Sequence, residues 1–126
     1  MVELSIVQKS KGTLPRVSFR AIAEDILKGS AEVSLAFVEP RIAKKLNLTL
    51  RGKNYPANIL TFPFSKNNGE IIICPKEAKR MAPEFGLTFK NMLILLFIHG
   101  LLHLKGVPHG ATMERLEARL LKRHSR

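Results

Sequence analysis

Three histidines stand close together in the last third of the chain. His99 and His103 are separated by three residues, and His109 follows after Gly106. Residues i and i+4 of a helix leave the same face one turn apart, so two imidazole nitrogens can reach one metal ion. A glycine that ends the helix lets the chain turn back and bring in a third imidazole. The spacing therefore predicts that one divalent transition metal, zinc, binds to His99, His103 and His109.

The predicted ligand set is of the catalytic kind. Three protein ligands with a fourth position open are typical of catalytic zinc sites, whereas structural sites are closed. Because all three ligands are neutral, the ion would keep its full charge and polarise an anionic substrate such as a phosphate ester. Cys74 is the only cysteine, which excludes both a thiolate-rich zinc site and an internal disulfide. We therefore expect metal-assisted hydrolysis.

The histidine spacing, H-x3-H-x2-G-x2-H, also occurs in the metzincin metalloproteases. Those enzymes carry a glutamate directly after the first histidine, where it acts as the general base. This chain has Gly100 at that position. A metallopeptidase is therefore an alternative, but this chain lacks the glutamate that serves as the general base in those enzymes.

The charge of the chain indicates a polyanionic partner. Lys and Arg number 21 against 10 Asp and Glu, which gives a net charge of +11 and a pI of about 10.3. Such an excess raises the local concentration of polyanions and speeds encounter with them. Nucleic acid is the first candidate and an anionic membrane the second, while a merely solvated basic surface is the plain alternative.

A basic segment upstream of the histidines could contact a phosphate. Arg51 and Lys53 stand beside Gly52, Asn54 and Pro56, so residues 51–58 are predicted to form an exposed loop. A guanidinium can clamp a phosphate with two parallel hydrogen bonds. We expect Arg51 to be catalytic and to bind substrate together with Lys53.

The rest of the sequence predicts the elements that position these residues. Period-two runs predict strands at 3–8, 32–38, 59–64 and 70–74, and helical patterns predict helices at 17–27, 41–46, 75 to about 86, 89–104 and 113–123. This order predicts a single α+β domain over residues 1–126, with a small four-stranded mixed sheet, packed helices and a zincin-like metal site on the long helix.

Local signals place the ends of the two C-terminal helices. Thr88 is the expected N-cap of the long helix and Gly106 its terminator. Thr112 is the expected N-cap of the last helix, and His124, in its polar last turn, is expected at the surface.

No targeting or membrane segment is expected. The N-terminus lacks a basic stretch followed by a long apolar run. The most apolar stretch, 92–98, is far shorter than the roughly 20 residues that a membrane span needs. We therefore expect a cytoplasmic protein with no membrane partner.

The segment H-G-L-L-H-L-K-G-V-P-H resembles the signature H-G-x-L-H-L-x-G-Y-D-H of the YbeY family of endoribonucleases, also called rRNA maturation factors. Residues 46–64 resemble the family segment L-N-x-x-x-R-x-K-D-x-P-T-N-V-L-S-F-P, and residues 69–74 its G-D-I-x-I-C strand. The resemblance runs in order over residues 46–121. One departure is Val107-Pro108 in place of Tyr-Asp, which removes a carboxylate from beside the last histidine.

The resemblance implies a zinc-dependent, single-strand-specific endoribonuclease that acts in small-subunit rRNA 3′-end maturation and in ribosome quality control. It implies single-stranded rRNA, the small ribosomal subunit and its assembly factors as partners. It places one zinc ion on His99, His103 and His109, and the functionally important arginine at Arg51. A non-catalytic RNA-binding assembly protein with a structural metal remains an alternative, as does a metallopeptidase.

The net charge of +11 predicts that RNA binding depends on salt. RNA binding should weaken steeply with salt, because each phosphate that the protein neutralises releases a condensed counterion. Filter binding of single-stranded RNA across a salt series measures this slope. Affinity that barely changes from low to moderate salt would count against nucleic acid as the partner.

Overall fold

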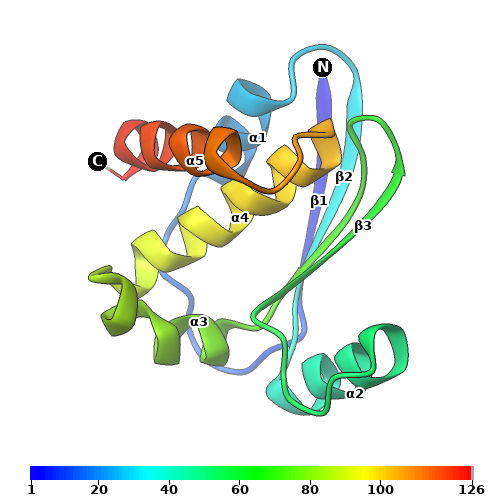
Figure 1. Cartoon of the computed structure of the whole chain (residues 1–126), viewed down its shortest axis with the longest axis vertical. Helices are drawn as coiled ribbons and strands as arrows, with labels where there is room; N and C mark the ends of the chain where they lie inside the picture. Colours follow the sequence, from blue (N-terminus) through cyan, green and yellow to red (C-terminus); the bar gives the residue numbers. More distant parts are fainter. Residues whose placement is uncertain (126) are drawn as a thin grey trace.

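The computed structural model describes residues 1–125. The elements in chain order are β1 (Val2–Gln8), α1 (Phe19–Ile26), β2 (Ala31–Phe37), α2 (Pro40–Arg51), β3 (Ile59–Ser65), β4 (Asn68–Ile73), α3 (Pro75–Met81), η1 (Ala82–Phe85), α4 (Phe89–Lys105) and α5 (Ala111–His124) (Figure 1). The α+β order predicted from the sequence is confirmed.

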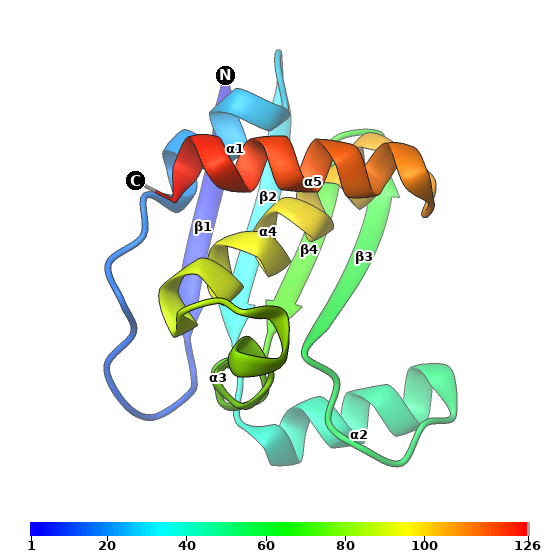
Figure 2. The same ribbon diagram turned by 60° about the vertical axis from the view of Figure 1, so that its left-hand side comes forward.

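The four strands form one mixed sheet in the order β1-β2-β4-β3. β2 is parallel to both β1 and β4 (Figure 2). β3 is antiparallel to β4 and forms one edge of the sheet, with β1 at the other. The hairpin between β3 and β4 turns at Asn67, which has the positive φ of 68° that asparagine tolerates better than most residues. The predicted four-stranded mixed sheet is therefore confirmed.

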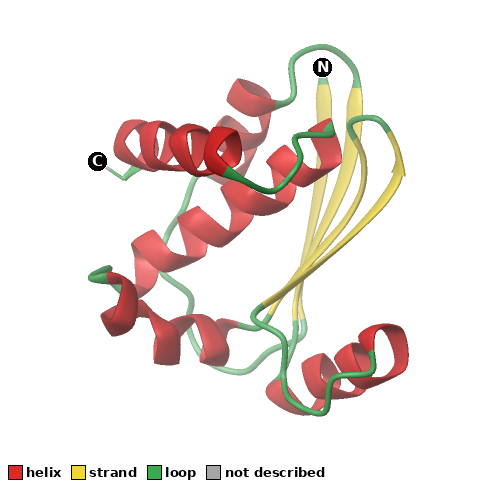
Figure 3. Cartoon of the chain, in the orientation of Figure 1, coloured by secondary structure: helices red, strands yellow, loops and turns green. Residues whose placement is uncertain are grey.

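One face of the sheet carries the main core. α1, α3, α4 and α5 lie on this face, while α2 lies near one end of the sheet (Figures 1 and 3). Alternate residues of β2 point inward and are buried, namely Ala31, Val33, Leu35 and Phe37. The residues between them, Glu32 and Ser34, are exposed on the opposite face. A half-buried sheet of this kind produces the period-two pattern seen in the sequence.

α4 is the central helix of the core. It is apolar on almost every side, as expected of a helix covered by both a sheet and other helices. The predicted N-cap is confirmed, because the Thr88 hydroxyl accepts a hydrogen bond from the Asn91 amide at 3.1 Å. The predicted terminator is also confirmed, since Gly106 has a φ of 95°.

Two predicted helix boundaries were wrong. The second helix was expected over 41–46, but α2 continues to Arg51 and ends at Gly52, whose φ is 69°. Arg51 is therefore the last residue of a helix and not part of the loop. The last helix begins at Ala111 with Gly110 as its N-cap, so Thr112 lies within the helix.

The C-terminal end of α5 is fastened to α1. Asp25 Oδ2 lies 2.8 Å from Arg123 Nη1 and 2.8 Å from His124 Nε2. His124 is thus largely buried against α1, and the prediction of a surface histidine was wrong. Partial burial raises the pKa of Asp25, but the contacts with His124 and Arg123 outweigh it and lower the pKa below its ordinary value.

In the described part of the chain, no single helix is long and apolar enough to cross a membrane. The pair Pro75–Phe85 and Phe89–Lys105 meets the length and composition criteria only when taken together, and it is bent by 104°.

Asp25→Asn should reduce the free energy of unfolding at neutral pH by up to about 1 kcal/mol. The folded pKa of Asp25 is depressed, so its contribution is present above the unfolded pKa and is lost as the pH falls through the folded pKa. Urea unfolding at neutral and at acidic pH measures the difference. The neighbouring exposed Glu24→Gln is the matched control, and a gap between Asp25→Asn and wild type that persists in acid would contradict this assignment.

Candidate active site

The two helical histidines lie on a stripe of α4 that is only half-buried. Asn91, Leu95, His99 and His103 recur every four residues, and all four are half-buried. The residues between them are buried from Met92 to Leu104. The predicted i, i+4 arrangement is thus present, with both imidazoles on the same open stripe.

The third histidine reaches the other two from the turn after α4. The helix ends with hydrogen bonds from the Gly106 amide to the His103 carbonyl and from the Val107 amide to the Leu102 carbonyl, both 3.0 Å. The chain then turns back, and the ring centroid of His109 lies 5.2 Å from that of His99 and 5.5 Å from that of His103. The three imidazoles that the sequence grouped thus lie close together, and their role as metal ligands stays a prediction.

The three histidines line a cleft of about 610 Å³ beside the edge strand β3. Its lining comprises Leu50, Arg51, Asn58, Ile59, Leu60, Thr61, Phe62, His99, His103 and His109. Arg51, exposed at the C-terminal end of α2, thus shares the cleft with the three histidines. Lys53 is exposed two residues later and does not line this cleft, so its role in binding phosphate stays a prediction.

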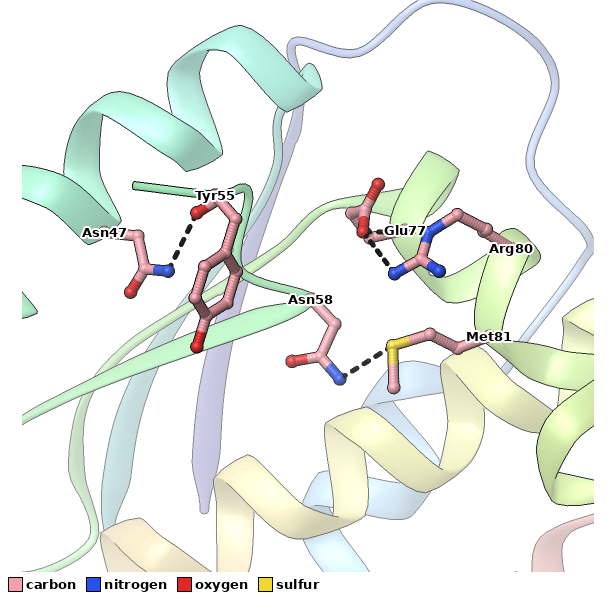
Figure 4. A network of polar contacts seen from close by, with 6 residues as sticks. All are labelled: Asn47, Tyr55, Asn58, Glu77, Arg80 and Met81. Atoms are coloured by element: carbon pink, nitrogen blue, oxygen red, sulfur yellow. Dashed lines mark hydrogen bonds and ion pairs between the residues drawn. The ribbon is translucent and has the colours of Figure 1, made fainter. Parts of the chain in front are cut away.

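Two asparagines hold the segment that follows Arg51. The fully buried Asn47 donates from Nδ2 to the Tyr55 carbonyl at 2.9 Å, which ties the loop back onto α2. Asn58 Nδ2 lies 3.2 Å from the Met81 sulfur (Figure 4). The backbone carbonyl of Asn58 accepts a hydrogen bond from the Cys74 amide at 3.0 Å. These contacts hold the middle and the end of the segment that connects α2 to β3.

Burial changes the protonation of His103. Desolvation lowers the pKa of its imidazole, and the neighbouring rings of His109 and His99 lower it further. The neutral form, which has a free nitrogen lone pair, is therefore favoured at neutral pH. A neutral imidazole is the form that binds a metal.

Two ring distances in the histidine cluster can be compared with those around a shared ion. Two imidazoles bound to one tetrahedral zinc, with nitrogens about 2.0–2.1 Å from the ion, have ring centroids roughly 5 Å apart. The observed distances of 5.2 and 5.5 Å agree with this value. Within residues 1–125, however, no group of three or more His, Cys, Asp or Glu side chains is placed so that it could hold a metal ion. The zinc site therefore stays a prediction that the donor types and ring spacing fit.

His99 also contacts a carboxylate that the sequence analysis missed. Its Nδ1 lies 2.6 Å from Oε2 of Glu117, which belongs to α5. The only signal in the sequence was the place of Glu117 on the apolar stripe of its helix, beside Met113, Leu116 and Leu120. Two polar cleft residues, Asn58 and Thr61, were not assigned a role either.

The comparisons with known proteins agree over nearly the whole chain. The family model described as Endoribonuclease YbeY matches residues 5–125. The chain belongs to the YbeY family. The Endoribonuclease YbeY of Bdellovibrio bacteriovorus is 34% identical, with 88% of this chain and 83% of that protein covered. That of Thermotoga neapolitana is 32% identical, with 96% and 84% covered.

A solved structure has the same fold. The solution structure of a Thermotoga maritima protein superposes with a TM-score of 0.70 at 30% sequence identity, covering 94% of this chain and 87% of that one. The resemblance noted in the sequence is therefore confirmed. As the description of the family model states, the family is one of endoribonucleases, that is, hydrolases of RNA phosphodiester bonds.

The fold also explains why this YbeY chain has a glycine after its first histidine. A Cβ added to Gly100 would lie 2.9 Å from Ile71 Cδ1 and 3.1 Å from Ile71 Cγ2, both on the buried centre of the sheet. A larger side chain would have to displace Ile71, so a glutamate base of the metzincin kind is disfavoured at this position. This observation counts against the metallopeptidase alternative.

Proposed function

We propose that this chain is a zinc-dependent endoribonuclease that cleaves single-stranded RNA during maturation of the 3′ end of small-subunit rRNA, with a role in ribosome quality control. The observation that carries the proposal is the gathering of three histidines and an arginine in one cleft. Membership of the YbeY family supports the RNA-cleaving part of it.

His99, His103 and His109 would hold the zinc ion. When bound there, zinc supplies Lewis-acid polarisation of a phosphate and of water. The protein contributes a partly buried cleft, in which electrostatic interactions are stronger than in bulk water. Burial also keeps His103 neutral and able to act as a ligand.

Arg51 would bind and orient the scissile phosphate. Its guanidinium can donate two parallel hydrogen bonds to phosphate oxygens and offset the charge that develops in the transition state. Asn58 and Thr61 add an amide and a hydroxyl to the cleft wall, where they can hydrogen-bond to the ribose or to the phosphate. The cleft therefore offers positive charge and polar groups to an anionic backbone.

The partners follow from the substrate. The net charge of +11 favours rRNA over an acidic protein surface, and the small ribosomal subunit with its assembly factors would present that RNA. Such a substrate would place the protein in the cytoplasm. Lys53, exposed just beyond Arg51, would contact a neighbouring phosphate outside the cleft.

Purified protein should contain one zinc ion per chain, and His103→Ala should lose it, because two histidines alone bind zinc far more weakly than three. Elemental analysis gives the stoichiometry. His124→Ala is the matched control, since His124 contacts Asp25 outside the cleft and should leave the zinc content unchanged. Undiminished zinc in His103→Ala would contradict the assignment.

A cleavage assay on single-stranded RNA, with and without chelator, separates the proposal from its alternatives. Chelation should abolish cleavage by the wild-type protein. A non-catalytic assembly protein would bind RNA equally well with and without chelator and would cut nothing. Cleavage of casein in place of RNA would identify a metallopeptidase.

Arg51→Ala should slow RNA cleavage by roughly 10²–10³-fold, because it removes a charge interaction that strengthens in the transition state. Stability should change by no more than about 0.5 kcal/mol, since the side chain is exposed. Arg51→Lys should rescue activity only in part, because an ammonium lacks the planar fork of donors.

Cleavage rates and melting temperatures of these variants give the measurement. Lys44→Ala is the matched control, because Lys44 is an exposed cation of the same helix that does not line the cleft. Equal cleavage by wild type, Arg51→Ala and Arg51→Lys would show that Arg51 is only solvated. A large loss of melting temperature would show that it is structural.

A further inference from the structure

Glu117 occupies a position on α5 where an apolar residue is expected. The face of α5 that meets the core carries Met113 and Leu120, both buried, and the half-buried Leu116. Glu117 lies on this same face, and only 18% of its side chain is exposed. A carboxylate in such a place costs free energy unless it is paired.

The partner of this carboxylate is His99. Glu117 Oε2 lies 2.6 Å from His99 Nδ1, a distance typical of a short, charge-assisted hydrogen bond. An imidazole has two ring nitrogens, and in His99 it is Nδ1 that is hydrogen-bonded to Glu117. Since His99 also lines the cleft with His103 and His109, its remaining nitrogen, Nε2, is the one available to a ligand there.

We propose that Glu117 is a positioning residue of the histidine cluster. It accepts a hydrogen bond from the protonated Nδ1 of neutral His99, which selects one tautomer and leaves the Nε2 lone pair free. A carboxylate in this role fixes the orientation of a metal-binding imidazole and raises its basicity. The inference rests on the proposed function for the identity of the ion, but the selection of the tautomer does not require a metal.

A purely structural alternative makes a different prediction. If Glu117 only fastened α5 to α4, its removal would change stability and leave the His99 tautomer as it was. The two readings therefore separate in a measurement on the metal-free protein. Long-range ¹⁵N–¹H correlation spectra at about pH 8, above the ordinary imidazole pKa of about 6.5, report which ring nitrogen carries the proton.

In wild-type protein we expect His99 to carry its proton on Nδ1. Glu117→Leu completes the apolar stripe of α5, so the variant should fold, and His99 should then populate both tautomers. Glu117→Gln keeps the shape of the side chain, but its amide can either accept from Nδ1 or donate to it, so this variant should also show both tautomers. Glu114→Leu, an exposed site on the same helix with the same change of charge, should match wild type.

Zinc affinity gives the second measurement. Competition titration against a chromophoric chelator should show weakening of about 10–100-fold in Glu117→Leu and none in Glu114→Leu. If both Glu117 variants give the spectra of folded proteins and His99 still carries its proton on Nδ1, the proposal is wrong. If the Glu117 variants populate both tautomers but the wild-type protein binds no zinc, the proposed function is refuted and the role of Glu117 is supported.

Discussion

The architecture of the site depends on one close approach between helix and sheet. At Gly100 the backbone of α4 lies so near β4 that an added Cβ would meet Ile71 Cδ1 at 2.9 Å. A side chain at this position would have to displace Ile71, so glycine favours the close contact between α4 and the sheet. With Gly100 turned toward the sheet, the stripe that carries His99 and His103 faces the open side next to β3. Burial of α4 therefore sets the side of the helix on which the two imidazoles lie, and the Glu117 contact acts on the His99 ring within that arrangement.

The same burial determines the electrostatics of the cleft. Desolvation lowers the pKa of His103, so the neutral form of this imidazole is favoured even though the chain carries a net charge of +11. The positive charge of the cleft comes from Arg51 at its rim, where water still reaches the side chain. Three imidazoles and one guanidinium therefore line the same cleft.

Features encoded by local signals could be predicted from the sequence. Thr88 and Gly106 set the limits of α4 through their own backbone and side-chain chemistry, and the His99–His103 spacing follows from helical geometry alone. The length of α2 could not be predicted, because Leu48 and Leu50 in its last turns are exposed and do not continue an apolar stripe. The role of Glu117 could not be predicted either. A glutamate on an amphipathic helix is expected to be solvated, and only the packing of α5 on α4 brings it to His99.

α5 supplies no predicted zinc ligand, yet the geometry of the cluster depends on it. Only the short turn from Gly106 to Gly110 separates α4 from α5, so a shift of α5 would displace His109 within that turn. The helix is held in the core by Met113 and Leu120, and its far end is held to α1 by the contacts of Asp25 with Arg123 and His124. Because Met113 and Leu120 anchor the N-terminal and middle part of this helix in the core, they hold the adjacent His109 turn and the Glu117 carboxylate together. The placement of His109, unlike that of His99 and His103, therefore depends on packing that begins beyond the histidine motif itself.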